Sequence, residues 1–339
     1  MYTFRFMILR ERAMQPEDIP ECVEILANHP VVGPRYGKAI ENLPDALNQL
    51  LESEAQTTTV MFSDTSATAP ICWIGISVFV RDDFLDDLKK PPHWWIGAEL
   101  TRRIVRGQSP LLSGKELREA NSRGGLNLVC WEGSTRRGCE VNGEWLRFMM
   151  STFIEKHRGY LWKEIIGAQP ESMDYLLLAL NTGGRFWDPL RGGYTPSMRE
   201  TPTDILRRPH VLGVSRDMDR GELMGSWAGV LFDYHPPVFG LSESEQRLLV
   251  SALTGVTDEQ LAETHGISLS AIKKRWISIH RRVQDAKPDL TSTDAPASGR
   301  GKEKRRRLLA YVRDHPEELR PVSHKLLGEG VRAGRVPAR

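Results

Sequence analysis

The sequence has few cysteines, and none of them is spaced for binding a metal. The four cysteines (Cys22, Cys72, Cys130 and Cys139) include no CxxC pair. Zinc sites and disulfide frameworks place cysteines at short, regular spacings. The histidines also lack an HxxxH or HExxH spacing. We therefore expect neither a metal site nor a disulfide framework, and we expect the thiols to be reduced and mainly buried.

A long apolar run is also missing. A membrane-spanning helix needs about 20 predominantly apolar residues, and no stretch of the chain approaches that length. The first residues, MYTFRFMILRER, are too short and too charged for a secretory signal. We therefore expect a cytoplasmic protein that does not bind a membrane.

The charge of the chain is small overall but unevenly distributed. The formal net charge is +2, yet residues 241–339 hold 19 Lys and Arg against 13 Asp and Glu. The first 240 residues are therefore net acidic. Basic charge concentrated in one third of a chain predicts a polyanionic partner for that third. A length of 339 residues also predicts two or three domains.

Hydrophobic periodicity and turn residues divide the chain into five regions. Apolar runs at 57–64, 71–80 and 125–133 predict strands, and the patterns at 16–30, 143–157 and 172–181 predict helices. A stretch rich in Pro, Gly and Arg predicts a connector. The regions are an α/β ligand- or partner-sensing domain (1–200), a connector (201–240), a helical domain (241–285), a flexible linker (286–302), and a basic helix with a disordered tail (303–339).

Residues 255–283, GVTDEQLAETHGISLSAIKKRWISIHRRV, predict two helices joined by a glycine turn. Thr257 with Gln260 forms a capping box, Gly266 ends the first helix, and Ser268 caps the second. The second helix has one apolar stripe and is cationic elsewhere. The stripe consists of Ile272, Trp276, Ile279 and Val283. A short helix, a tight turn and a longer cationic helix are typical of a helix-turn-helix that binds duplex DNA.

Residues 241–283 resemble the LuxR-type helix-turn-helix. The resemblance is carried by Leu241, Ser242, Glu245, Gly255, Thr257, Gln260, Leu261, Ala262, Ile267, Ser268, Ala271, Ile272 and Lys273. Together with the helix geometry, it implies contacts to double-stranded DNA from Thr257, Ser268, Ser270, Lys273, Lys274, Arg275, Ser278, Arg281 and Arg282. Accessory phosphate contacts are expected from Lys304, Arg305, Arg306 and Arg307. Region 4 of sigma factors looks similar at Arg275, which leaves open an adaptor that contacts RNA polymerase.

The first 200 residues resemble the GNAT-type acyltransferase fold in the order of their elements. LRERAMQPEDI (9–19) resembles its opening strand and turn, and NTGGRFW (181–187) resembles its closing segment. The family's acyl-CoA loop corresponds to EGSTRRGCEVNGEW (132–145), where the glycine spacing differs. Arg136 and Arg137 are the candidates there for holding an anionic ligand. We identify no catalytic base from the sequence.

These observations lead to one expected architecture, one expected function and two alternative functions. The expected fold class is an α/β N-terminal domain (α+β, with a GNAT-like mixed sheet) followed by an all-α helix-turn-helix domain. The expected function is transcriptional regulation, in which the N-terminal domain senses an unknown small ligand or protein partner and the chain forms a homodimer. The first alternative is a GNAT-type acyltransferase fused to a DNA-binding module, with acyl-CoA as its cofactor. The second is a sigma-like adaptor; neither the regulator nor the adaptor requires a cofactor.

Overall fold

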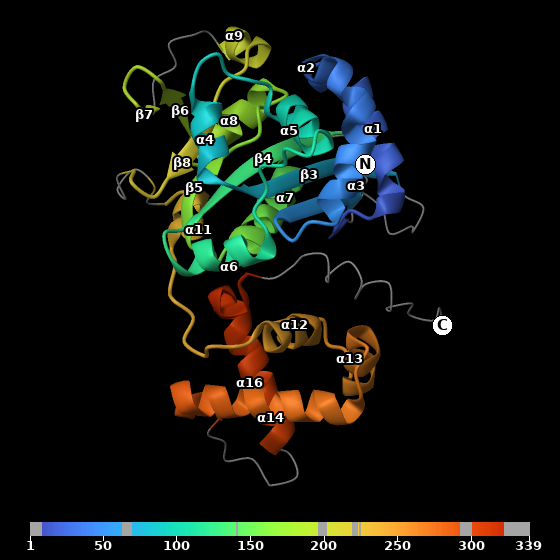
Figure 1. Cartoon of the computed structure of the whole chain (residues 1–339), viewed down its shortest axis with the longest axis vertical. Coiled ribbons are helices and arrows are strands. Elements are labelled where there is room, and N and C mark those ends of the chain that lie inside the picture. The colour runs from blue at the N-terminus through green and yellow to red at the C-terminus, as the bar shows by residue number, and fades with distance from the viewer. Residues whose placement is uncertain are drawn as a thin grey trace, which may run out of the picture. The chain divides into compact units, whose positions relative to one another are not determined.

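The computed structural model divides the chain into two compact units (Figure 1). Unit 1 comprises Met1–His157 and Leu161–Phe232, and unit 2 comprises Arg158–Tyr160 and Asp233–Arg339. The structure describes residues 9–62, 70–139, 142–195, 202–218, 223, 225–291 and 300–321. Within these ranges, no helix has the length and apolar character needed to cross a membrane.

Unit 1 is built on one eight-stranded mixed sheet. The strand order is β1-β2-β3-β4-β5-β8-β6-β7. Only the β4–β5 pair is parallel among the described pairs, and the others are antiparallel. The strands are β1 (Arg10–Arg12), β2 (Gln56–Phe62), β3 (Ile71–Val80), β4 (Leu126–Thr135), β5 (Trp162–Ile166), β6 (Arg185–Asp188), β7 (Gly193–Thr195) and β8 (Leu212–Ser215). The expected mixed α/β class of this part of the chain is confirmed.

Helices cover both faces of the sheet (Figure 1). The larger core cluster packs α1, α2, α3 and α5 against one face, and α7 packs against the other through Trp145 and Met149. The helices are η1 (Pro16–Asp18), α1 (Ile19–Asn28), α2 (Val32–Tyr36), η2 (Gly37–Asn42), α3 (Leu43–Leu51), α4 (Asp82–Lys89), α5 (Ile96–Val105), α6 (Gly114–Ser122), α7 (Gly143–His157), α8 (Met173–Asn181), α9 (Pro202–Arg207) and α11 (Trp227–Phe232).

Strand β3 shows how the sequence divides its residues between the two faces. From Ile74 onward, the even-numbered residues belong to the larger cluster under α1, α3 and α5. The odd-numbered residues Trp73, Gly75 and Ser77 face the other side, because side chains alternate along a strand. Every residue of β3 is buried. A strand covered on both faces therefore reads as one apolar run in the sequence.

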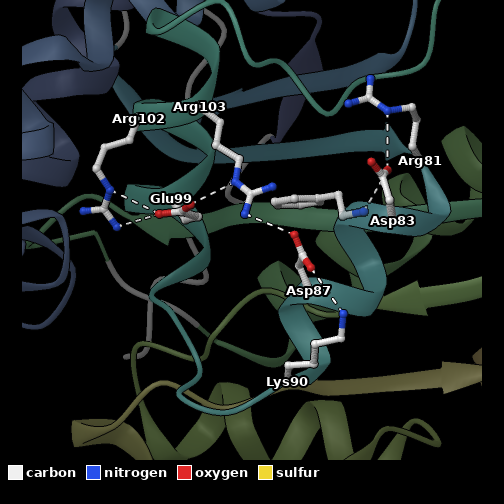
Figure 2. A network of polar contacts seen from close by, with 8 residues as sticks. Arg81, Asp83, Asp87, Lys90, Glu99, Arg102 and Arg103 are labelled. Carbon is white, nitrogen blue, oxygen red and sulfur yellow. Dashed lines mark hydrogen bonds and ion pairs between the residues drawn. The ribbon is translucent and has the colours of Figure 1, made fainter.

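Helices α4 and α5 are joined by a network of ion pairs (Figure 2). Glu99 binds Arg102 and Arg103, each at 2.9 Å. Arg103 also lies 3.5 Å from Asp87, which in turn lies 3.5 Å from Lys90. Solvent-exposed pairs such as Lys90 with Asp87 contribute little, typically about 0.2–1 kcal/mol each, whereas Glu99 is half-buried. The network ties two helices together, and its charges are satisfied by one another.

The prediction that residues 201–240 form a connector with little regular structure is wrong. It contains α9, β8 and α11, and β8 pairs with β5 on one side and with β6 on the other. Its Pro and Gly residues suggested a loop. The four residues of β8 are too few to show a period, and only long-range pairing makes them a strand.

Unit 2 is mostly helical. Its elements are α12 (Glu243–Ala252), α13 (Asp258–His265), α14 (Leu269–Ala286), α15 (Pro288–Thr291), α16 (Arg300–Asp314) and η3 (Pro316–Leu319). The predicted capping boxes at Ser242 and Thr257 are present, and Gly266 ends α13 with φ 61°. The predicted apolar stripe of α14 is confirmed, since all four of its members are buried.

Helix α16 belongs to the same core as α14. Leu308 and Val312 pack in the cluster that contains Leu248 and Ile279. The segment expected to be a flexible linker (286–302) is therefore partly helical, because it contains α15 and the first turn of α16. Residues 292–299 of that segment, and the tail expected beyond residue 321, lie outside the described residues.

Candidate functional site

The central strands β4 and β5 separate partway along their length. Their parallel pairing begins at Leu126 and ends where Val129 pairs with Ile166, while β4 continues to Thr135. Beyond the last pair, the edge of β4 that faces β5 has lost its strand partner. Buried backbone N–H groups require a hydrogen-bond acceptor. Side chains or a ligand must therefore satisfy this edge.

Two glutamate carboxyl groups satisfy it. Glu132 Oε1 accepts from the backbone N–H of Gly133 at 3.2 Å. Glu171 Oε1 accepts from the backbone N–H of Thr135, also at 3.2 Å. Both glutamates are buried. Two carboxyl groups thus lie along one edge of one strand, where β5 has diverged.

A β-bulge in β4 precedes Glu132 directly. Ile76 of β3 is opposite Glu132, but the next residue, Ser77, is opposite Cys130, so Trp131 is the extra residue. A bulge re-aims the side chains beside it, and bulges are frequent next to active sites. The irregularity therefore marks this part of the sheet as a candidate site.

Hydrogen bonds from two hydroxyl groups hold the Glu132 carboxyl in place. Tyr36 of α2 donates to Oε2 at 3.1 Å, and Ser134 donates to Oε1 at 3.0 Å. The indole N–H of Trp131 donates in turn to the Tyr36 oxygen at 3.1 Å. Because each donor comes from a buried residue, the carboxyl has a fixed position and orientation.

Glu171 is approached by a histidine. His29 Nδ1 accepts the backbone N–H groups of Val31 at 3.3 Å and Val32 at 3.2 Å. An acceptor at Nδ1 places the proton of the neutral ring on Nε2, and Nε2 lies 3.2 Å from Glu171 Oε2. Burial and the charge of Arg35 lower the pKa of His29, so the ring is neutral, and this close contact is not a regular hydrogen bond. His29 thus presents an N–H group to the carboxyl of Glu171.

Burial raises the proton affinity of both carboxyl groups. The pKa of Glu171 is raised from 4.5 to about 7, first by burial and then by the charge of Glu132. Burial also raises the pKa of Glu132, against hydrogen bonds from Ser134 and Gly133 and the charge of Arg35. Buried carboxyl groups that repel each other titrate as a pair. This pair can therefore take up or release a proton near neutral pH.

Arg35 of α2 fixes the segment that carries Glu171. Its guanidinium donates to the carbonyl oxygens of Gln169 at 2.8 Å, Pro170 at 2.7 Å and Leu206 at 2.9 Å. It also lies 4.5 Å from the centre of the Trp95 ring. Because its partners are carbonyl groups, its positive charge acts over a distance on the two glutamates.

A cavity of about 170 Å³ is lined by Glu132, one of the two glutamates of the pair. Glu132 and Gly133 line it from β4, and Gly167 and Ala168 line it from the segment after β5. The rest of the lining is mainly apolar and comes from β2, β3, α7, α8 and α11. A mainly apolar hollow with a few convergent polar groups is the usual form of a small-molecule site.

Tyr175 of α8 supplies a second polar group of the cavity wall. Its hydroxyl lies 2.8 Å from Thr135 Oγ1. Burial raises the pKa of Tyr175 to about 12. The phenol therefore stays protonated at neutral pH and can donate a hydrogen bond to a bound molecule.

The structure does not bring the two predicted anion-binding arginines together. Arg136 donates to the Ile71 carbonyl at 2.6 Å and forms an ion pair with Glu21, whereas Arg137 is exposed. Within the described ranges, no group of His, Cys, Asp and Glu side chains is arranged to hold a metal ion.

Several residues predicted to contact DNA have partners inside unit 2. Ser278 donates to Glu245 at 2.6 Å, and Arg282 lies 3.2 Å from the same carboxylate. Thr257 and Ser268 accept hydrogen bonds as the N-caps of α13 and α14. The other predicted residues of α14 lie at the surface or are half-buried. They are Ser270, Lys273, Lys274, Arg275 and Arg281.

The predicted accessory cations of α16 are mostly paired as well. Arg305 forms an ion pair with Asp258 at 2.6 Å and lies over the Trp276 ring. Arg306 and Arg307 both bind Glu303, at 2.8 and 3.0 Å. Lys304 is half-buried. Much of the basic charge of this third of the chain therefore stabilises unit 2 itself.

Comparison with known proteins includes a remote match to a solved structure. No family model matches the chain, and no curated protein matches it. Among solved structures, the C-terminal condensation domain of Ebony in complex with beta-alanyl-dopamine aligns with 61% of this chain and 98% of that one. The sequence identity is 12% and the TM-score is 0.35. Similarity at that level supports no conclusion about activity.

The comparisons contradict both family resemblances inferred from the sequence. No family model matches the chain, LuxR-type and GNAT-type models included. The prediction of a LuxR-type DNA-binding regulator is therefore wrong, together with its GNAT-type and sigma-like alternatives. The glycine turn and capping boxes on which the regulator depended are real, but short helices that meet at a tight turn need them whatever their function.

The sequence reasoning missed both glutamates. Glu132 is the one charged residue within LNLVCWEGST, the buried strand β4. A charge in such a strand is a signal for a functional group, because burying it is costly. Glu171 carries no comparable signal, since it follows Gln169 and Pro170 in what reads as an ordinary turn.

Proposed function

We propose that unit 1 is the catalytic part of an enzyme that removes a proton from a small, largely apolar molecule. The observation that carries the proposal is the pair Glu132 and Glu171, buried side by side on the open edge of β4 beside a cavity. A general base works best when its pKa lies near the working pH. The two carboxyl groups titrate as a coupled pair, and the raised pKa of Glu171 brings one proton of that pair near neutral pH.

The roles of the residues follow from their positions. Glu132 lines the cavity, so it is the group that accepts the proton of the bound molecule. Glu171 is the second carboxyl group of the pair, and the His29 ring packs against it, with Nε2 3.2 Å from Oε2. Tyr175, which stays protonated, donates a hydrogen bond to negative charge that develops on the bound molecule. His29 is thus a positioning residue, whereas Glu132 and Tyr175 touch the substrate.

A chromogenic base reporter tests the proposal in the full-length protein. The ring of 5-nitrobenzisoxazole opens when a base takes its C3 proton: the C–H electron pair forms the nitrile, the N–O bond breaks, and its electron pair stays on the oxygen, which gives one coloured product that carries both the nitrile and the phenolate. We expect saturable ring opening that increases with pH as the carboxyl pair loses its proton. Glu132→Gln should remove the acceleration, because a glutamine cannot accept the proton.

Two controls make the result decisive. Glu99→Gln changes a glutamate of the surface network in Figure 2 and should leave the rate unchanged. Carboxyl titration by NMR should find one glutamate with a pKa near 7 that disappears in Glu171→Gln. A folded wild-type protein with only the background rate and ordinary glutamate pKa values would overturn the proposal.

A further inference from the structure

Two glycines face each other in the middle of the sheet. Gly75 of β3 is paired with Gly133 of β4. Glycine weakens a strand and often marks a place where another group approaches the backbone. A Cβ atom at Gly75 would lie 2.1 Å from Cη2 of Trp73, and one at Gly133 would lie 3.6 Å from Cζ2 of the same ring. The indole of Trp73 therefore lies over the backbone of both strands.

This indole forms part of the cavity wall beside Glu132. Trp73, Gly75 and Gly133 line the cavity from the sheet. Six residues of α7, the helix packed on this face, also line it: Met149, Met150 and Phe153, together with the polar Thr152, Lys156 and His157. The sheet supports one face of the indole, and flexible thioethers pack nearby. Aromatic rings stack on such a surface, and methionine adapts to what is bound.

Three residues that line the cavity each have a buried polar atom with no hydrogen-bond partner among the described residues. These atoms are Trp73 Nε1, Trp227 Nε1 and Thr57 Oγ1. Buried polar groups almost always have one. Trp227 is held edge-on against Phe153, with ring centres 5.3 Å apart. An indole N–H can only donate, so a molecule that pairs with either indole must offer an acceptor.

The volume of the cavity limits the size of the bound group. A cavity of about 150 Å³ engineered into another protein binds benzene, and this one measures about 170 Å³. We infer that the group recognised here is a single planar ring that bears a hydrogen-bond acceptor, with the ring stacked on Trp73 and the acceptor bound by the N–H of Trp227. The inference rests on the proposed function, because it names the class of molecule whose proton the carboxyl pair removes. Trp73 is then a specificity-determining residue.

Two carboxamides of equal size test the inference by calorimetric titration of the full-length protein. Benzamide has a planar ring, whereas cyclohexanecarboxamide carries the same acceptor on a puckered ring. Stacking on an aromatic side chain should make benzamide bind about three- to tenfold more tightly. Trp73→Leu should abolish that preference, and Trp73→Phe should retain part of it. Trp227→Phe should weaken both carboxamides, because the N–H donor is lost.

The outcomes separate this inference from the proposed function. Glu132→Gln should keep the preference for benzamide while losing the ring-opening activity. A preference for benzamide in a protein without that activity supports the ring site and contradicts the proposed base. Equal affinity of the wild type for both amides, no binding of either, or an unchanged preference in a folded Trp73→Leu variant overturns the inference.

Discussion

Glu132 and Glu171 bind the same edge of β4, one at the amide of Gly133 and the other two residues further on, at Thr135. In a continuous sheet, these amides would bond to a neighbouring strand. A neutral side chain could accept the same hydrogen bonds without the cost of burying a charge. The property that two glutamates add is their capacity to hold a proton.

Glu171→Gln should stabilise unit 1 at pH 8 and have little effect at pH 4. The pKa of Glu171 is about 7 in the folded state and 4.5 ordinarily. Between these values the folded state holds a proton that the unfolded state releases, so the free energy of unfolding falls as pH rises. The shift corresponds to roughly 3 kcal/mol. Glutamine avoids this loss and keeps an oxygen for the Thr135 amide.

Urea unfolding followed by tryptophan fluorescence measures this difference. Eight of the nine tryptophans lie before residue 240, so the signal reports mainly on unit 1. A difference between variant and wild type that stays constant from pH 4 to pH 8 would contradict the raised pKa of Glu171.

Arg35→Met should destabilise unit 1 by about 2–4 kcal/mol, because it leaves buried carbonyl groups without donors. The three carbonyls are those of Gln169, Pro170 and Leu206. Loss of the nearby positive charge should also raise the pKa of Glu132, which Arg35 lowers. Urea unfolding and NMR titration provide the two measurements. Arg102→Met, in the network of Figure 2, is the matched control: the Arg102 side chain is partly exposed and Glu99 keeps Arg103 as a partner, so this variant should cost less than about 1 kcal/mol. Equal effects of the two substitutions would contradict the role given to Arg35.

Alanine at the two facing glycines should have unequal effects. At Gly75 the new methyl group would lie 2.1 Å from the Trp73 ring, whereas at Gly133 it would lie 3.6 Å away, an ordinary contact distance. Overpacking of this kind costs about 1–3 kcal/mol, so Gly75→Ala should lower the unfolding midpoint clearly more than Gly133→Ala. Similar midpoints for both variants would show that Trp73 does not occupy the position described.

The sequence predicted the regular parts of this molecule better than its site. Long periodic segments such as β3 and α14 carry a signal that their own residues supply, and both formed as expected. The site depends on where β5 parts from β4 and on a bulge at Trp131, and both are set by pairing between distant segments. No local pattern records such pairing, so Glu132 and Glu171 could not be placed together from the sequence.

The error about unit 2 has a related cause. The basic charge and the capped helices of this segment predict a DNA-binding surface, but a sequence does not show which cations already have partners within the protein. Arg305 is paired with Asp258, and Arg282 with Glu245, across 47 and 37 positions of the chain. Such pairs neutralise a basic segment from within. The net charge of the segment therefore overestimates the positive charge that is available to a binding partner.

Glu245 should prove to be the main polar anchor of unit 2. It accepts from the Ser242 backbone at 2.8 Å, from Ser278 at 2.6 Å, and lies 3.2 Å from Arg282. Burial raises its pKa, but the hydrogen bonds from Ser278 and Ser242 and the charge of Arg282 outweigh that effect, and the net shift is downward. A lowered pKa stabilises the fold above the ordinary value of 4.5, and this contribution is lost as pH falls below it.

Glu245→Gln should therefore cost unit 2 about 1–3 kcal/mol at pH 7 and clearly less at pH 3. Amide hydrogen exchange in α12 and α14 measures this, because it reports on unit 2 separately from the larger sheet. Glu243→Gln is the matched control: Glu243 lies two residues away in α12 and forms an exposed pair with Arg247. Exposed i,i+4 pairs contribute about 0.3–0.5 kcal/mol, so this variant should exchange nearly as slowly as the wild type. Equal protection in both variants, or a loss that does not diminish at low pH, would show that the Glu245 carboxylate does not anchor these two helices.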